Sequence, residues 1–169
     1  YAYGKEDNQK WIIVDMGVTF ADDTIPGVDL IMPDPGFIID KKNDLLGIVL
    51  THAHEDHIGA VAHIWPELKC KLYATPFTAA LLIEKFKEKK IDISSFLKIV
   101  PLNSQIKLGA FEIDFVTLTH SILEPNGLSI KTPLGTILHT GDWKIDPNPL
   151  IGGSVDEKKL KKIGEKGVS

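Results

Sequence analysis

The chain combines short apolar runs, rich in β-branched residues, with longer segments of helical periodicity. Runs of this kind are typical of buried strands, and here they predict strands at 11–15, 46–51 and 71–74. Apolar positions then recur at helical spacing from Pro76 to about Lys90, with the proline in the first turn. The first half of the chain is therefore predicted to alternate strands with helices.

The pattern changes in the second half of the chain. Residues 111–118 alternate apolar and polar side chains, as a strand with one buried face does. Two further runs, 128–131 and 136–139, flank a segment at 132–135 whose residues suit a type I turn, which predicts an antiparallel hairpin. Together with the alternating strands and helices, this hairpin favours a layered α/β (α+β) domain with a mixed β-sheet.

Size and composition limit the possibilities. At 169 residues with 43% hydrophobic residues, the chain is expected to be one domain or part of one. Its net charge of −4 gives no general attraction for nucleic acid, so an anionic substrate must be held locally. The single cysteine, Cys70, excludes an internal disulfide and favours a cytoplasmic protein. No apolar run approaches the roughly 20 residues that cross a membrane, so no membrane contact is expected.

Candidate chemistry is concentrated directly after the strand predicted at 46–51. A cluster with the spacing His-x-His-x-Asp-His is formed there by His52, His54, Asp56 and His57. Imidazole and carboxylate groups are good zinc ligands, and they converge at this spacing only where the backbone turns tightly. We expect the first two histidines to bind one metal ion, and Asp56 and His57, at the start of the next helix, to point to a second. A solvated turn whose histidines cap a helix is the alternative.

Two later segments complete the predicted metal site. His120 lies just beyond the strand at 111–118, and Asp142 follows the strand at 136–139, where Gly141 permits an unusual backbone turn. Either residue alone would be interpreted as a surface or turn residue. With the earlier cluster, both are expected to bind metal, with the strand ends reaching the same sheet edge. The predicted metal ligands are His52, His54, Asp56, His57, His120 and Asp142.

Other polar and aromatic residues allow several interpretations. His139 could orient Asp142 or line the site, whereas His63 is expected to be a packed or surface histidine. Trp143 and Lys144 could contact a base and a phosphate of a single strand, but burial of the tryptophan is an equally good interpretation. A group of lysines that follows acidic residues predicts an exposed helix rather than an RNA-binding patch: Lys158, Lys159, Lys161 and Lys162.

The motifs resemble those of the metallo-β-lactamase superfamily, which has the same histidine and aspartate cluster, a later isolated histidine and a Thr-Gly-Asp turn. Within the superfamily, the sequence is similar to the bacterial ribonuclease J family over nearly its whole length. The likeness is most specific in Pro-Gly-Val-Asp at 26–29 and Thr-Gly-Asp-Trp-Lys-Ile-Asp at 140–146. It departs at 121–124, Ser-Ile-Leu-Glu, where the family commonly has a proline before the acidic residue.

The resemblance implies an αββα sandwich of the metallo-β-lactamase type that holds two zinc ions, with manganese as an alternative. It divides the six ligands into two sets: His52, His54 and His120 hold one ion, while Asp56, His57 and Asp142 hold the other, with Asp142 bridging. The family also has a further downstream histidine, an inserted β-CASP domain and a C-terminal dimerisation domain, which are not in this sequence. Residues 1–169 are therefore expected to be a partial domain, inactive alone, from a homo-oligomeric protein.

For the intact protein, the resemblance implies zinc-dependent hydrolysis of RNA phosphodiester bonds from the 5′ end, with internal cleavage as a further activity. The expected catalytic residues are Asp56, His57 and Asp142, and Asp56 is expected both to bind metal and to orient the attacking water. A thioesterase or lactonase of the same fold, without the inserted domain, is one alternative. A non-catalytic metal-binding or interaction module is another, and a chain that retains no zinc would favour a scaffold role.

Overall fold

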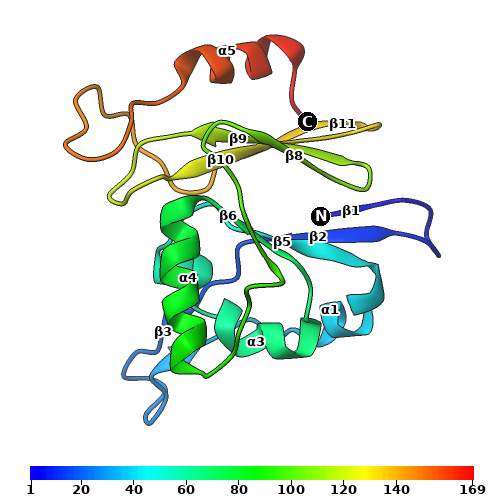
Figure 1. The fold of residues 1–169 in the computed structure, drawn as a ribbon, viewed down its shortest axis with the longest axis vertical. Coiled ribbons are helices and arrows are strands. Elements are labelled where there is room, and N and C mark those ends of the chain that lie inside the picture. The colour runs from blue at the N-terminus through cyan, green and yellow to red at the C-terminus, as the bar shows by residue number, and fades with distance from the viewer.

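The computed structural model describes residues 1–169 as two β-sheets that face each other (Figure 1). The five-stranded sheet has the order β1-β2-β5-β6-β7, formed by Ala2–Tyr3, Lys10–Val14, Leu45–Val49, Leu72–Ala74 and Leu97–Ile99. The four-stranded sheet has the order β11-β10-β9-β8, and in chain order its strands are Gln105–Leu108, Phe111–Thr117, Asn126–Thr132 and Gly135–His139. A separate short hairpin pairs β3 (Thr19–Phe20) with β4 (Leu30–Ile31).

Helices cover the outer faces of both sheets. They are α1 Gly36–Asp40, α2 Glu55–Ile58, α3 Val61–Leu68, α4 Pro76–Glu88 and α5 Glu157–Lys166, with a 3₁₀ turn at Lys42–Asp44. Figure 1 shows α1, α3 and α4 beside the five-stranded sheet and α5 on the far side of the four-stranded sheet. The layers therefore run helix, sheet, sheet, helix, which confirms the predicted αββα sandwich.

The five-stranded sheet is mixed, as expected. Strands β2, β5, β6 and β7 run parallel, and β1 pairs antiparallel with β2. The larger hydrophobic core joins side chains of this sheet to those of α3 and α4, with Ile48, Leu72 and Phe86 fully buried. Trp65 of α3 packs edge to face against Phe86 of α4, with ring centroids 5.4 Å apart. This core holds the parallel strands, and hence the loops at their carboxyl ends, in fixed positions.

The four-stranded sheet is antiparallel throughout. Strands β10 and β11 form the predicted hairpin, which closes at the pair Thr132↔Gly135. A second core lies between the sheets and contains Ile12, Val49, Val100, Leu108, Phe111, Ile113, Phe115, Leu128 and Ile130. Apolar packing on both inner faces therefore fixes the position of one sheet against the other.

The expectation that the strands before the predicted ligands share one sheet edge was wrong. The segments after β9 and β11 leave the four-stranded sheet, whereas the histidine cluster follows β5 in the five-stranded sheet. Alternating apolar residues identify a strand, but they do not identify its neighbours in a sheet. The metal-binding chemistry is therefore assembled from both sheets.

The helix-like segment at 58–65 is divided between α2 and α3. The backbone N–H of Ala60 donates to the carbonyl oxygen of Met16 at 3.0 Å, outside its own helix. In turn, the N–H of Met16 donates to the carbonyl oxygen of His57 at 2.7 Å. The loop after β2 thus takes up backbone hydrogen bonds that a continuous helix would satisfy internally.

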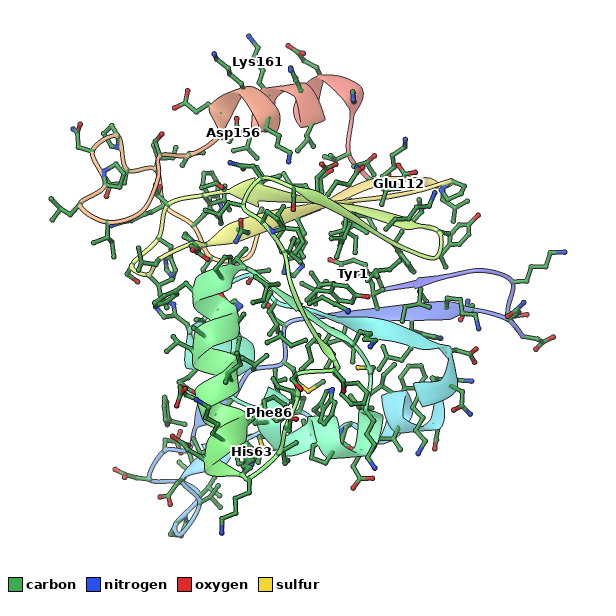
Figure 2. All side chains as sticks on the ribbon, in the orientation of Figure 1. Tyr1, His63, Phe86, Glu112, Asp156 and Lys161 are labelled. Carbon is green, nitrogen blue, oxygen red and sulfur yellow. The ribbon has the colours of Figure 1, made fainter.

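The expected surface positions are confirmed for His63 and for Lys158, Lys161 and Lys162, whereas Lys159 is partly buried and its ammonium donates to the Phe115 carbonyl oxygen at 2.8 Å. His63 is exposed on α3, with its Nδ1 3.2 Å from Lys89 Nζ, while Phe86 lies inside the core (Figure 2). Helix α5 buries no residue, and the Asp156 carboxylate caps it by accepting the Lys159 N–H at 3.0 Å. No helix is long and apolar enough to cross a membrane.

Cys70 is expected to resist thiol reagents in the folded protein. Its side chain belongs to the larger core, and burial raises the pKa of the thiol to about 12. A disulfide reagent at about pH 8 should therefore find almost no thiolate in native protein and one reactive thiol in denaturant, measured by the released chromophore. A Cys70→Ala variant should give no signal in either condition. Rapid reaction of the native protein would contradict the stable burial of this side chain.

Candidate metal centre

The histidine cluster lies in the tight loop between β5 and α2. His52 is 1% exposed, and His54 occupies the N-cap position of α2, which places Asp56 and His57 in the first turn. The loop after β2 passes so close to this turn that a Cβ at Gly17 would lie 1.7 Å from the Asp56 carbonyl oxygen. Glycine is therefore required at residue 17 for the loop and the cluster to pack together.

Asp15 fixes this loop from the neighbouring strand. Its carboxylate accepts the Thr51 backbone N–H at 2.8 Å, the Thr51 hydroxyl at 2.7 Å and the His57 Nδ1–H at 2.8 Å. Sequence reasoning assigned no role to Asp15, although it placed the residue at the end of a buried strand. The parallel pair Val14↔Val49 brings that strand end beside the start of the cluster.

These hydrogen bonds determine which ring nitrogens are free to bind metal. Because Asp15 accepts from His57 Nδ1, the neutral His57 ring has its lone pair on Nε2. The Thr51 hydroxyl gives its hydrogen to Asp15 and lies 3.0 Å from His52 Nδ1, so it accepts the hydrogen of that nitrogen. His52 Nε2 is therefore also unprotonated. One carboxylate thus prepares two histidines as ligands.

The two predicted ligands that follow strands of the four-stranded sheet lie close to the same loop. His120 follows β9, and Asp142 follows β11 beyond Gly141, which adopts φ 56° and lies against Asn126. The Asn126 side-chain amide donates to the Thr51 carbonyl oxygen at 3.2 Å, joining β10 to the loop after β5. This contact ties the two sheets together at the site.

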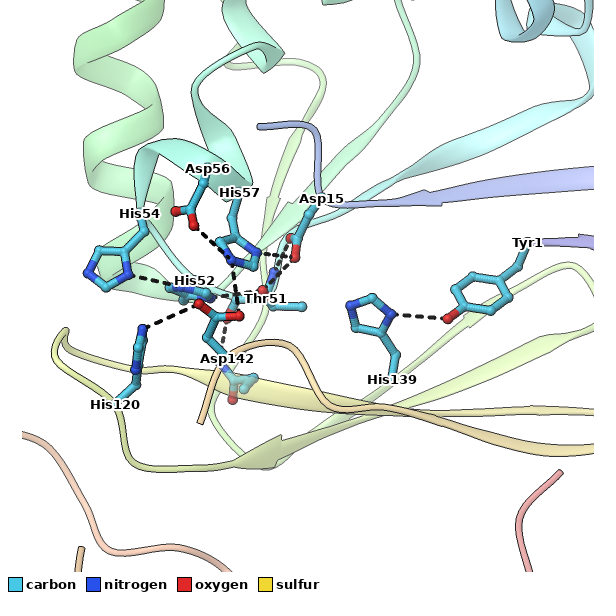
Figure 3. A network of polar contacts seen from close by, with 11 residues as sticks. Tyr1, Asp15, Thr51, His52, His54, Asp56, His57, His120, His139 and Asp142 are labelled. Carbon is cyan, nitrogen blue, oxygen red and sulfur yellow. Dashed lines mark hydrogen bonds and ion pairs between the residues drawn. The ribbon is translucent and has the colours of Figure 1, made fainter. Parts of the chain in front are cut away.

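Two compact groups of possible metal donors result, with ligand atoms within 4.8 Å of one another in each. The groups are His52, His54 and His120, and His52, His57 and Asp142. Figure 3 shows the Asp142 carboxylate between His57 of its own group and His120 of the other, with Oδ1 3.5 Å from His57 Nε2 and Oδ2 3.7 Å from His120 Nε2. The structure therefore brings together five of the six predicted ligands in these groups.

Asp56, the sixth predicted ligand, lies at the edge of this arrangement. Its Oδ2 is 3.8 Å from His57 Nε2, and its side chain is 64% exposed. The compact group around His57 contains His52 rather than Asp56. Asp56 as a ligand of the second ion therefore stays a prediction.

Burial and charge set the proton affinities of the histidines. Burial lowers the pKa of His52 to about 4, helped by the charge of His57. For His57, burial alone would lower the pKa, but the hydrogen bond to Asp15 and the nearby carboxylates raise it above the usual value. The pKa of His120 is lowered, first by burial. His52 and His120 are thus neutral at pH 7, as metal binding requires.

The donor set fits a divalent metal. His52 Nε2, which is unprotonated, lies 3.2 Å from His54 Nδ1, so a cation at this position would have two imidazole nitrogens as ligands once the hydrogen between them is displaced. Imidazole and carboxylate are also the ligands that zinc prefers in proteins.

The expectations for His139 and Trp143 hold only in part. His139 Nδ1 lies 3.0 Å from the Tyr1 hydroxyl, so orientation of Asp142 by this histidine was wrong. It does line the site: a cleft of about 640 Å³ is bounded by His139, Asp15, Asp56 and His57 among others. Trp143 is 47% exposed, so the interpretation that it is buried was also wrong.

The sequence model of the "Metallo-beta-lactamase superfamily" matches residues 3–153, and the chain belongs to this superfamily. Within it, the chain is similar to ribonuclease J. The Ribonuclease J of Sinorhizobium meliloti is 45% identical over 170 residues, which cover 99% of this chain and 30% of that protein. That of Helicobacter pylori is 41% identical over 158 residues, 93% of this chain and 23% of the relative. The chain thus spans less than a third of the length of these relatives.

Solved structures support the fold. The metallo-beta-lactamase fold protein YhfI from Bacillus subtilis matches with a TM-score of 0.57 at 15% identity, covering 86% of this chain and 55% of that one. Zn(2+)-bound PqqB from Methylobacterium extorquens matches with a TM-score of 0.50 at 13% identity, covering 81% of this chain and 46% of that one. At such low identity the likeness concerns the fold alone.

Proposed function

We propose that the protein containing this chain is a metal-dependent ribonuclease that hydrolyses RNA phosphodiester bonds. The observation that carries the proposal is the position of Asp142, whose carboxylate oxygens lie 3.5 Å and 3.7 Å from histidines of two different donor groups. A carboxylate so placed suits a pair of cations about 3.5–4 Å apart, the arrangement used in phosphodiester hydrolysis. Similarity to ribonuclease J over 99% of the chain supports RNA as the substrate.

The proposed ligand sets are His52, His54 and His120 for one ion, and Asp56, His57 and Asp142 for the other, with Asp142 shared. Zinc is the first choice and manganese the second, because both accept imidazole and carboxylate ligands. When bound, the ions lower the pKa of a water molecule towards about 7 and neutralise charge on phosphate oxygens.

The residues of the chain have separate tasks in this proposal. Asp15 and Thr51 hold the His57 and His52 rings so that each Nε2 points into the site. Asp56 is exposed beside His57, so its carboxylate can accept a hydrogen bond from the attacking water and orient it toward phosphorus. Metal ions and positioned side chains together suffice, without a covalent nucleophile from the protein.

The proposed activity belongs to the full-length protein. Its finer features are cleavage from the 5′ end, with internal cleavage as a second mode. Because the chain spans 30% of the Sinorhizobium meliloti relative, we expect substrate-binding parts to lie elsewhere in the protein and residues 1–169 to be inactive alone. We also expect the full-length protein to be a cytoplasmic homo-oligomer.

The direct test compares full-length wild-type protein with His54→Ala on a 5′-monophosphorylated RNA. Loss of one donor of the first group should slow cleavage by at least about 100-fold, because a metal ion supplies several kcal/mol of charge stabilisation. His63→Ala is the matched control, since this exposed histidine belongs to neither donor group and its ring nitrogen pairs with Lys89. Equal RNA cleavage by wild type and His54→Ala would disprove the proposal. A wild type that hydrolyses thioesters or lactones but not RNA would favour a small-molecule hydrolase.

A further inference from the structure

His139 and Tyr1 form a pair at the edge of the cleft, outside both metal-donor groups. The Tyr1 hydroxyl lies 3.0 Å from His139 Nδ1, and the rings pack edge to face with centroids 6.2 Å apart. His139 pairs with Leu128 across the strands, so its side chain lies on the inner face of the four-stranded sheet. In Figure 3 its ring lies between Tyr1 and the metal-donor residues.

The cleft contains few groups that could hold a negatively charged strand. Its lining combines the carboxylates of Asp15 and Asp56 with the imidazoles of His57 and His139, the Thr19 hydroxyl and several apolar residues. No lysine or arginine is among these residues. The His57 ring uses one nitrogen for Asp15 and the other for the metal-donor group. His139 and the Thr19 hydroxyl are therefore the side-chain donors that remain for a substrate.

Tyr1 determines which nitrogen of His139 carries the hydrogen. Burial raises the pKa of the Tyr1 hydroxyl and lowers the pKa of the His139 imidazole, so both groups are uncharged at neutral pH. A phenol O–H is a stronger acid than an imidazole N–H, and an imidazole nitrogen is a stronger base than a phenol oxygen, so the Tyr1 hydroxyl donates to Nδ1 and the ring hydrogen is on Nε2. That Nε2–H lies on the side of the ring away from Tyr1, and it has no partner in the protein.

We propose that His139 binds a phosphate of the substrate strand by donating its Nε2–H to a non-bridging oxygen of a phosphodiester beside the one that is cleaved. Tyr1 acts as a positioning residue that fixes the ring and its tautomer. The inference rests on the proposed function, because it requires a polyanionic strand in the cleft. A neutral donor suits this position, since it binds an oxygen without adding a positive charge next to the metal ions.

The test combines protein variants with altered substrates, using the metal-loaded full-length protein. One oligonucleotide carries natural phosphates, and the others each carry one neutral methylphosphonate at a position flanking the cleavage site, on a 2′-O-methyl nucleotide for chemical stability. His139→Ala should raise KM about tenfold on the natural substrate, the loss expected for one hydrogen bond to a charged group. It should have no effect on KM when the contacted phosphate is replaced.

Further variants separate binding from a structural role. Tyr1→Phe should raise KM by a smaller factor on the natural substrate, again with no effect on the matching methylphosphonate. His139→Gln keeps a side-chain N–H donor and should recover part of the loss. The thermal unfolding midpoint should fall slightly in Tyr1→Phe and His139→Ala, which both lose the Tyr1–His139 hydrogen bond, and this fall should not depend on which substrate is cleaved.

The outcomes distinguish this inference from the proposed function. Suppose that the wild type cleaves RNA and that His139→Ala raises KM by the same factor on every substrate, or does not raise it at all. The phosphate contact is then overturned while the ribonuclease function stands. If the wild type cleaves no RNA, both are overturned. If His139→Ala raises KM on the natural substrate but not on the substrate with a methylphosphonate at one particular position, the contact is supported and the phosphate at that position is the one bound.

Discussion

Asp142→Ala in the full-length protein is expected to reduce metal binding at both proposed ion sites and to slow RNA cleavage by on the order of 10⁴-fold. The carboxylate lies 3.5 Å from His57 Nε2 and 3.7 Å from His120 Nε2, so in the proposed arrangement its removal takes a negative ligand from both ions at once. Loss of His54, by contrast, affects one group only. The effect of Asp142→Ala should therefore exceed that of His54→Ala.

Metal content by mass spectrometry and cleavage of a labelled RNA would measure both effects. Asp142→Asn keeps the shape of the side chain but removes its charge, so it should lose most of the activity as well. Asp44→Asn is the control, because Asp44 pairs with Lys10 at 2.7 Å and belongs to neither donor group. A variant Asp142→Ala that retains two ions per chain and normal activity would exclude a shared ligand at this residue.

The candidate metal site could be predicted from the sequence because most of its donor residues lie close together in the chain. His52, His54 and His57 follow one strand in a single tight turn, so their spacing alone indicates a common centre. His120 and Asp142 were predictable only as residues at the ends of strands. Their approach to the cluster depends on how the two sheets pack, and the apolar pattern of each strand contains no information about that packing.

The contacts that support the ligands could not be predicted, because they join residues far apart in the chain. Asp15 reaches Thr51 and His57 only because β2 lies beside β5, a pairing that neither strand specifies by itself. Likewise, His139 was expected near Asp142, its neighbour in sequence, but its hydrogen bond goes to Tyr1 at the other end of the chain. Hydrogen bonds of this kind become visible only once the fold is known.

Asp15→Ala is expected to be the most damaging change outside the two metal-donor groups. It leaves the Thr51 backbone N–H, the Thr51 hydroxyl and the His57 Nδ1–H without their acceptor. The free energy of unfolding of the metal-free protein should fall by about 3 kcal/mol, because a partly buried carboxylate that accepts several hydrogen bonds is lost. Metal affinity should fall about 10–100-fold, since His57 loses the group that orients it.

The size of the stability loss should depend on pH. Asp15 helps to hold the pKa of His57 above its usual 6.5, so their pairing stabilises the folded state fully below pH 6.5 and loses this effect as the pH rises through the raised pKa. The difference in unfolding free energy between wild type and Asp15→Ala should thus be larger at about pH 5.5 than at about pH 8.5, in chemical denaturation with a chelator present. The difference in unfolding free energy that persists at high pH is due to the hydrogen bonds from Thr51 to Asp15.

Asp15→Asn separates these contributions further. The amide keeps an oxygen that can accept from Thr51, but it lacks the charge that favours protonated His57. We expect it to retain part of the high-pH stability while the extra stability of the wild type at low pH disappears. A pH-independent difference in both variants would mean that Asp15 acts on the loop through Thr51 alone, and the tautomer of His57 would then need another cause.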